Sequence, residues 1–481
     1  MELIFEKSRP GRKGLTLPEK DVPAEAKLDP KYARKEDAEL PCVSELDVVR
    51  HFTNLSNMNF GVDSNFYPLG SCTMKYNPKF TERIAAMEEF AALHPLQPQL
   101  IMGGMLTQGA LEILYELENM LCEISGMDEF TCHPMAGAHG ELTGVMLIAA
   151  YHKSKGKRRK YILIPDSGHG TNPASAAIAG YEVRSIRTDE AGVMDIGEIK
   201  KALNEDVAGV MLTCPNTLGI FNPRIKEIAD LTHKAGGLMY YDGANLNAIM
   251  GKTRPGDLGF DIVHLNLHKT FATPHGGGGP GSGPVGVRQE LVPFLPISRV
   301  VKRKDGTFAL DYDRPLSIGY ISPFYGNFAV MLKAYAYMLL LGRKGLTEVS
   351  ENAVLNANYL KSRLKDHYDI PYSENCMHEF VISASRQAEN GVHAIDIAKA
   401  LIDRRIHPPT VYFPLNVKEA IMIEPTETES METLDRFADI MIELAELAEK
   451  DPDAFKELPK TTAVGRLDEV KAAKDMNLCA L

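Results

Sequence analysis

Lys269 has the sequence surroundings that point most directly to chemistry. It ends the segment HLNLHK, which reads as the end of a buried strand, and the loop TPHGGGGPGSG, made mostly of small residues, comes soon after it. A single lysine at the end of a strand is ordinarily a solvated surface residue. A lysine removed from water instead has a lowered pKa, and its neutral amine can attack an aldehyde to form a Schiff base. The segment therefore predicts a lysine that binds a carbonyl group.

Asp242 fits the second requirement of such a site. Pyridoxal phosphate is the natural aldehyde partner of a lysine, and its ring nitrogen needs an acid beside it. Asp242 ends the apolar segment GLMYYD, where a carboxylate is costly unless it is paired. Facing a pyridinium at about 3 Å, it gains about 5 kcal/mol at an effective dielectric constant near 20, or about four pKa units. A strand-end aspartate that caps the following turn is an equally open interpretation.

A phosphate group would need backbone N–H donors. The segment MAGAHGE joins a predicted strand to a predicted helix through small residues, so the N–H groups of Ala138 and His139 could bind a phosphate. Tight packing alone would also explain these small residues. His268, beside the lysine, is a further candidate for contact with the phosphate.

Three other residues could contact the ring. His169 in the segment GHGTNPAS could stack on the pyridine, although a lone histidine is more often structural, and Thr171 follows it as a candidate contact. Asn245 lies three residues after Asp242 and could reach the ring hydroxyl.

Two other patterns carry no function. GSGPVG formally matches the dinucleotide-binding pattern, but it follows no strand, opens no helix and contains a proline. His264 and His268 have a spacing that binds zinc on helices, yet on a strand they would lie about 13 Å apart. We therefore predict no metal site.

The elements that would position these residues alternate between strand and helix. From residue 107 to about 290, apolar strands such as YILIPD, VAGVMLTCP and IVHLNLH are separated by helical segments. This order predicts a mostly parallel sheet covered on both faces, in which ligands bind at the carboxyl ends of the strands. We expect an extended arm with short helices at 1–106, a large α/β domain at 107–326 and a small α+β domain with a tail at 327–481.

Composition limits the class of protein. The 481 residues carry a formal net charge of −11, which argues against nucleic-acid binding. The seven cysteines are scattered and form no C-x-x-C pair, as is typical of free thiols in a reducing compartment. No signal peptide and no apolar stretch of roughly 18 residues is present, so we expect a cytoplasmic protein.

Taken together, these segments resemble a known family. HLNLHKTF, HGTNPAS, YDGAN and YPLGSCTMKYNP look like the P-protein of the glycine cleavage system, and PPTVYFP and IEPTETES extend the similarity to the C-terminal region. The resemblance implies a fold-type-I pyridoxal-phosphate enzyme of the aspartate-aminotransferase type. The length, the lysine and the LGSCTMK segment are similar to subunit 2, the lysine-bearing half of a two-subunit enzyme.

The resemblance also implies an activity and partners. The expected reaction is decarboxylation of glycine, with transfer of the aminomethyl group to the lipoyl group of the H-protein. Pyridoxal 5'-phosphate would be covalently bound to Lys269, with Asp242 at the ring nitrogen, His169 on the ring, and Asn245 and His268 as secondary contacts. The homologous subunit 1 would be the partner, with two copies of each chain. Many relatives clamp the substrate carboxylate with an arginine of the small domain, for which this sequence shows no counterpart.

Three alternatives stay open. Another fold-type-I enzyme, such as a different amino acid decarboxylase or an aldolase, would share most of these residues. A desulfurase would need a nucleophilic cysteine, for which Cys72 and Cys376 are available. A catalytically silent scaffold subunit would bind no cofactor, so an absorbance spectrum would separate it from an enzyme.

Overall fold

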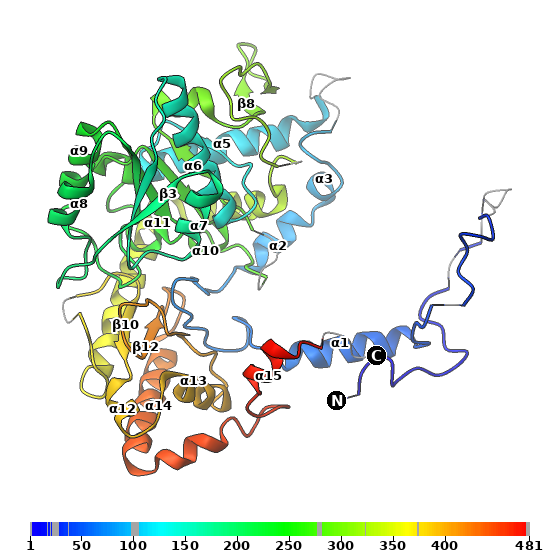
Figure 1. The fold of residues 1–481 in the computed structure, drawn as a ribbon. Helices are drawn as coiled ribbons and strands as arrows, with labels where there is room; N and C mark the ends of the chain where they lie inside the picture. The colour runs from blue at the N-terminus through cyan, green and yellow to red at the C-terminus, as the bar shows by residue number, and fades with distance from the viewer. Residues whose placement is uncertain are drawn as a thin grey trace.

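A seven-stranded sheet forms the centre of the large part of the chain (Figure 1). In this computed structural model the described residues are 2–16, 18–19, 21, 28–36, 38–97, 105–276, 281–322, 324–372 and 375–477, so part of the glycine-rich loop lies outside them. The strand order is β1-β7-β6-β5-β4-β2-β3. Five neighbouring strands run parallel, whereas β7 is antiparallel to both of its neighbours. The strands are β1 (Glu129–Thr131), β2 (Tyr161–Pro165), β3 (Glu182–Ile186), β4 (Val207–Thr213), β5 (Leu238–Gly243), β6 (Ile262–Leu265) and β7 (Val285–Val287).

Successive residues of the central strands point to opposite faces of this sheet. Tyr240 packs into the cluster of apolar side chains under α6, and Tyr241 packs into the larger cluster on the other face. Both tyrosines are essentially inaccessible to solvent. Because both faces are covered, the strands carry apolar residues almost continuously, as the sequence pattern predicts. The covering helices are α5 (Gln108–Ser125), α6 (Gly137–Ser154), α7 (Thr171–Ile178), α8 (Ile196–Ala202) and α9 (Ile225–Lys234).

The segment that carries the lysine is not a continuous strand. β6 ends at Leu265, and one helical turn, α10 (Leu267–Thr270), follows it. The prediction that HLNLH is extended throughout was therefore wrong, and the 13 Å separation derived from it does not apply. The amide N–H of Leu267 still bonds to the Ser282 carbonyl in the register of the β6–β7 pairing, but from Leu267 onward the chain forms a helical turn.

A second, smaller unit follows the long helix α11 (Phe328–Leu364). The first half of α11 packs in the core of the large unit and its last turns pack in the core of the small one. The small sheet is antiparallel, in the order β10-β12-β11. Its elements are β10 (Phe380–Ser383), β11 (Thr410–Val411), β12 (Ala420–Ile423), α12 (Ser385–Glu389), α13 (Ala394–Asp403) and α14 (Met431–Lys450).

The described residues of the N-terminal region include the helices α1 (Glu45–Asn57), α2 (Lys79–Ala85) and α3 (Glu88–Ala91), and α1 projects from the body of the molecule (Figure 1). Residues 66–70 lie along the small sheet: Leu69 forms a bridge with Ile423, and Thr410 donates a hydrogen bond to the Gly70 carbonyl. Residues 71–75 then cross to the edge of the large sheet. We call residues 66–75 the strap. Within the described part of the chain, no helix is both long and apolar enough to cross a membrane.

Replacement of Gly144 tests the packing of α6 against the sheet. Gly144 of α6 lies against Tyr240, and a Cβ atom at this position would come within 2.1 Å of the ring. The ring is held in place because its hydroxyl bonds to His264. We expect Gly144→Ala to lower the free energy of unfolding by about 1–3 kcal/mol in urea titrations. Gly109→Ala in α5 is the control, because nothing lies within 4 Å of its Cβ and alanine favours the helix. Equal effects of the two substitutions would contradict this account.

Lys75 anchors the end of the strap by a buried ion pair. Its Nζ donates hydrogen bonds to Glu427, 2.6 Å away, and to the Thr270 carbonyl, and both charged side chains are buried. Lys75→Met would leave Glu427 buried without its cation, so we expect a loss of about 3–5 kcal/mol of stability. Lys79→Met, which breaks an exposed ion pair with Asp63, should cost less than about 1 kcal/mol. A Lys75 variant as stable as the Lys79 variant would show that the strap is not anchored in this way.

Candidate active site

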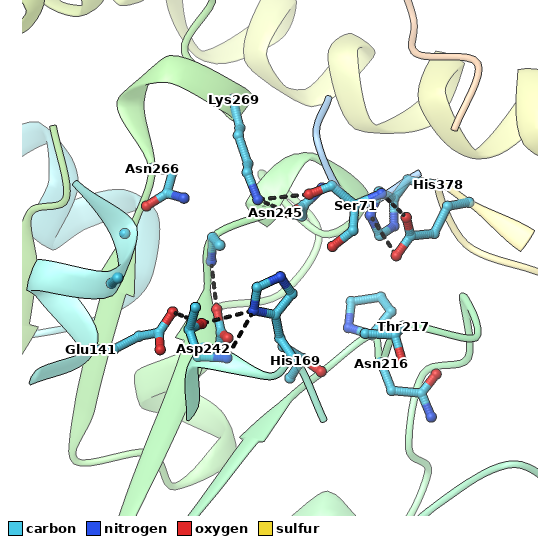
Figure 2. A pocket seen from close by; sticks show the side chains of 17 residues that line it. Ser71, Glu141, His169, Asn216, Thr217, Asp242, Asn245, Asn266, Lys269 and His378 are labelled. Carbon is cyan, nitrogen blue, oxygen red and sulfur yellow. Dashed lines mark hydrogen bonds and ion pairs between the residues drawn. The ribbon is translucent and has the colours of Figure 1, made fainter. Parts of the chain in front are cut away.

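A cavity lies at the carboxyl ends of the parallel strands (Figure 2). Six of the eight predicted site residues line it: Ala138, His169, Thr171, Asp242, Asn245 and Lys269. They come from loops and helix ends that follow β1, β2, β5 and β6, as expected for ligand sites of open parallel sheets. His139 and His268 are not among the residues that line the cavity.

The two remaining histidines have protein partners. Nδ1 of His139 accepts a hydrogen bond from the Met135 N–H, and Nδ1 of His268 accepts one from the Ser282 N–H. Burial lowers the pKa of His268 to about 3, so its ring is neutral. The structure therefore gives no support to the prediction that the His268 ring reaches a phosphate.

The amine of Lys269 points into the cavity and is held by two acceptors (Figure 2). Its Nζ donates to the Ser71 carbonyl at 2.7 Å and to Oδ1 of Asn245 at 3.0 Å. Asn245 in turn donates to Oγ1 of Thr73. The strap thus supplies one of the two acceptors of the lysine, although the sequence analysis assigned no role to Ser71.

Asp242 lies on the same cavity and is almost fully buried. Its Oδ1 accepts a hydrogen bond from the Ala244 N–H and lies 3.3 Å from Nε2 of His264. The other nitrogen of that ring, Nδ1, bonds to the Tyr240 hydroxyl at 2.8 Å. Asp242 can therefore both cap the turn at Ala244 and face a ring nitrogen. The adjacent His264 ring orients its carboxylate.

Glu141 is a cavity residue that the sequence analysis did not select. It lies on α6, one turn after Gly137, and accepts hydrogen bonds from the hydroxyls of Thr171 and Ser175. Burial and the nearby Asp242 raise the pKa of Glu141, which favours its protonated form. The sequence could have indicated Glu141, because it lies near the start of a predicted helix that follows a predicted strand, where ligands bind.

His169 and Thr171 lie at the edge of the cavity. Nδ1 of His169 is 2.7 Å from Oγ1 of Thr171, and this contact fixes the rotation of the ring. His169 is exposed to solvent, so its ring is accessible to a planar group entering the cavity.

The start of α6 leaves room for a ligand's anionic group. The first N–H groups of a helix have no partner within it, and those of Gly137 and Ala138 lie at the cavity. A Cβ atom on Gly137 would come within 2.7 Å of the Asn266 side chain, and Oδ1 of the buried Asn266 has no hydrogen-bond partner among the described residues. The N–H groups at the start of this helix fit the phosphate of the predicted cofactor, and Nδ2 of Asn266 is a further possible donor, whereas its Oδ1 is not.

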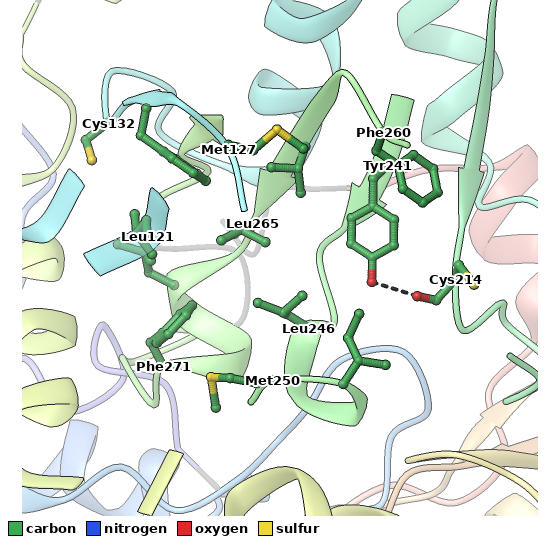
Figure 3. Close-up of a cluster of buried hydrophobic side chains, with 14 of the residues drawn as sticks. Leu121, Met127, Cys132, Cys214, Tyr241, Leu246, Met250, Phe260, Leu265 and Phe271 are labelled. Carbon is green, nitrogen blue, oxygen red and sulfur yellow. Dashed lines mark hydrogen bonds between the residues drawn. The ribbon is translucent and has the colours of Figure 1, made fainter. Parts of the chain in front are cut away.

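Apolar neighbours hold the polar residues in place. Leu246 follows Asn245, Leu265 precedes Asn266, and Phe271 lies two residues after Lys269 (Figure 3). All three are fully buried in the same core cluster. Asn245, Asn266 and Lys269 therefore each have a buried apolar side chain one or two residues away, which restricts the motion of the backbone that carries them.

Two clusters of carboxylates and histidines have ligand atoms within 4.8 Å of one another: Glu141 with Asp242 and His264, and His378 with Glu379 and Glu424. Protein hydrogen-bond donors already occupy the carboxylates, as Thr171 does for Glu141. The prediction that the site needs no metal stays a prediction.

Comparison with known proteins identifies the family. A sequence model of the glycine cleavage system P-protein matches residues 14–309, and one of the glycine dehydrogenase C-terminal domain matches residues 349–458. Probable glycine dehydrogenase (decarboxylating) subunit 2 of Caldanaerobacter subterraneus is 58% identical over 98% of this chain and 97% of its own length. The corresponding protein of Bacillus velezensis is 58% identical over 98% of this chain and 96% of its own.

Solved structures agree on the fold. A crystal structure of glycine decarboxylase (P-protein) of the glycine cleavage system, in inhibitor-bound form, has a TM-score of 0.71 at 21% identity and covers 86% of this chain and 92% of its own. Lactobacillus brevis glutamate decarboxylase has a TM-score of 0.66 at 12% identity, over 91% and 96% of the two chains. The fold is thus that of fold-type-I pyridoxal-phosphate enzymes, and the chain belongs to the glycine cleavage system P-protein family, in its group of glycine dehydrogenase (decarboxylating) subunits 2.

Proposed function

We propose that this chain binds pyridoxal 5'-phosphate covalently through Lys269 and decarboxylates glycine as subunit 2 of the glycine cleavage system P-protein. The observation that carries the proposal is the shared cavity of Lys269, Asp242 and His169, in which the lysine amine faces the open space. Lys269 is the only lysine or arginine among the described residues that line this cavity. Among these described lining residues, Lys269 thus provides the one side-chain amine that could bind the cofactor aldehyde.

The residues present fit the cofactor. Asp242 would hold the proton of the ring nitrogen, and His264 keeps its carboxylate in position. His169 would stack on the ring, and Asn245 and Thr171 would lie near its polar substituents. The backbone N–H groups at the start of α6, including those of Ala138 and His139, together with the Asn266 amide, would hold the phosphate.

When bound, pyridoxal phosphate withdraws electrons from the α-carbon of an amino acid attached to it, which stabilises the charge left behind when CO₂ departs. The Ser71 carbonyl and Oδ1 of Asn245 accept hydrogen bonds from the Lys269 amine, and they would keep it beside the reacting atoms. From there Lys269 can accept or donate a proton at the α-carbon.

Partners follow from the family. The relatives are named as subunit 2, and this chain spans nearly their whole length. We propose that the homologous subunit 1 completes the enzyme, with two copies of each chain, and that the aminomethyl group passes to the lipoyl group of the H-protein. The described cysteines are all free thiols, which supports a reducing, cytoplasmic location.

The desulfurase alternative lacks an activated thiol. Burial raises the pKa of Cys72 and of Cys376 to about 11 in each case, so neither is a thiolate at neutral pH. A cysteine desulfurase of Thermococcus onnurineus shares the fold, with a TM-score of 0.60 and 16% identity. That similarity concerns the fold alone.

Lys269→Ala tests the covalent attachment. We expect the variant to lose the visible absorbance band that wild type shows with pyridoxal phosphate, because no amine remains to bind the aldehyde. Exchange of ¹⁴CO₂ with glycine, measured with subunit 1 and lipoylated H-protein, should be abolished. Lys160→Ala, an exposed lysine, is the control and should keep both signals. Full exchange by the Lys269 variant would refute the assignment.

Asp242→Asn tests the role of the carboxylate. The substitution keeps the shape of the side chain and removes the charge that would hold the ring nitrogen protonated. We expect the rate of glycine-dependent CO₂ exchange to fall by about 10²–10³-fold, as for loss of one electrostatic contact in other active sites, with the cofactor still bound. An unchanged rate would show that Asp242 only caps the turn at Ala244.

A further inference from the structure

The cavity has a side formed by the small unit. His378 and Glu379 line it, and both precede β10. Two parts of the chain hold this segment in place: Met377 donates a hydrogen bond to the Gly219 carbonyl at 2.7 Å, and Ser71 donates from its N–H to Oε2 of Glu379 at 2.7 Å. Ser71 therefore accepts from Lys269 on one side and donates to Glu379 on the other. Figure 2 shows Lys269, Ser71 and His378 around the same space.

His378 is buried without a hydrogen-bond partner. Its exposed fraction is 1%, and neither ring nitrogen has a partner among the described residues. Its Nε2 lies 3.6 Å from Oε1 of Glu379, beyond hydrogen-bond distance. A buried polar side chain without partners costs about 1–3 kcal/mol, and such groups in native proteins have a reason to be there. In a cavity wall, that reason is a ligand.

We propose that His378 and Glu379 form the subsite for the carboxylate of glycine and hold it by hydrogen bonds rather than by an ion pair. This inference rests on the proposed function. It assigns the carboxylate contact for which the sequence offered no arginine, and among the described residues that line the cavity none is an arginine.

His378 and Glu379 can each carry a proton that they donate in a hydrogen bond. Burial is the main cause that raises the pKa of Glu379 well above its usual range, and the neighbouring Glu424 adds to it. A carboxylate arriving beside Glu379 would favour its proton further. Burial also lowers the pKa of His378, which leaves a neutral ring with one N–H donor. Both groups can thus donate to an anion without carrying charge.

Uncharged donors suit the reaction. The carboxylate of glycine is an anion, and the CO₂ that leaves is neutral. A buried guanidinium would stabilise the starting anion more than the transition state, and this difference would slow the loss of CO₂. Hydrogen bonds from the uncharged His378 and Glu379 would orient the carboxylate while stabilising the starting anion less than a guanidinium would.

The test compares glycine with methylamine, which has the same amine and lacks the carboxylate. Dissociation constants are taken from the change in cofactor absorbance when each amine is added to the complex with subunit 1. We expect His378→Leu to weaken glycine binding by about 10- to 100-fold and to leave methylamine binding unchanged. Glu379→Gln replaces the O–H donor by an amide N–H and His378→Gln keeps an N–H donor, so both variants should retain most of the glycine affinity.

Two results would overturn the subsite: equal losses for glycine and methylamine, or no loss for glycine. If His378→Leu does not bind the cofactor, the comparison rests on His378→Gln and Glu379→Leu, and the latter should weaken glycine binding selectively. The proposed function is judged separately, by the response of the wild-type spectrum to glycine and its dependence on Lys269. A wild-type protein that does not respond to glycine would refute both.

Discussion

The hydrogen bond from the Lys269 amine to the Ser71 carbonyl is the contact on which the site depends. Lys269 lies on α10 at the end of β6, Ser71 belongs to the strap, and the Ser71 N–H bonds to Glu379 of the small unit. The carbonyl can reach the lysine only because the strap crosses between the two units at this point. The position of the reactive amine thus depends on the packing of three segments that are far apart in the sequence.

The strap adopts an unfavourable backbone conformation to make these contacts. Ser71 and Thr73 have φ angles of 64° and 48°, a region that costs non-glycine residues about 1 kcal/mol or more each. Buried hydrogen bonds offset this cost: Thr73 donates from both its N–H and its hydroxyl to Glu424, and Lys75 pairs with Glu427. Two of the seven described non-glycine residues with positive φ thus lie in the strap, and one of them, Ser71, contacts the lysine.

The site combines several buried acids with Lys269, the one lysine or arginine among the described residues that line the cavity. Asp242 and Glu424 have donors that suit a carboxylate, whereas burial and a neighbouring acid raise the pKa values of Glu141 and Glu379. The two neighbouring pairs are Glu141 with Asp242 and Glu379 with Glu424. In each pair, the raised pKa of one acid keeps both from carrying a charge at the same time. In the proposed function, Asp242 would serve the ring nitrogen, and His378 and Glu379 would be uncharged donors on the side of the small unit. Such a division would suit a reaction in which negative charge leaves the substrate as a neutral molecule.

The sequence by itself determined the order of strands and helices, the choice of Lys269 and Asp242, and the edge of the sheet at which they meet. These features depend on local periodicity and on the rule that parallel strands end at one edge, so they need no knowledge of distant contacts. The tertiary structure decided that His268 is not among the residues that line the cavity, because a helical turn replaces the end of the predicted strand. It alone brought Ser71 to Lys269 and to Glu379, across 198 and 308 positions of the chain. No local pattern encodes contacts over such separations, since they arise only when the separate cores have packed; the domain boundaries expected at 106/107 and 326/327 stay predictions.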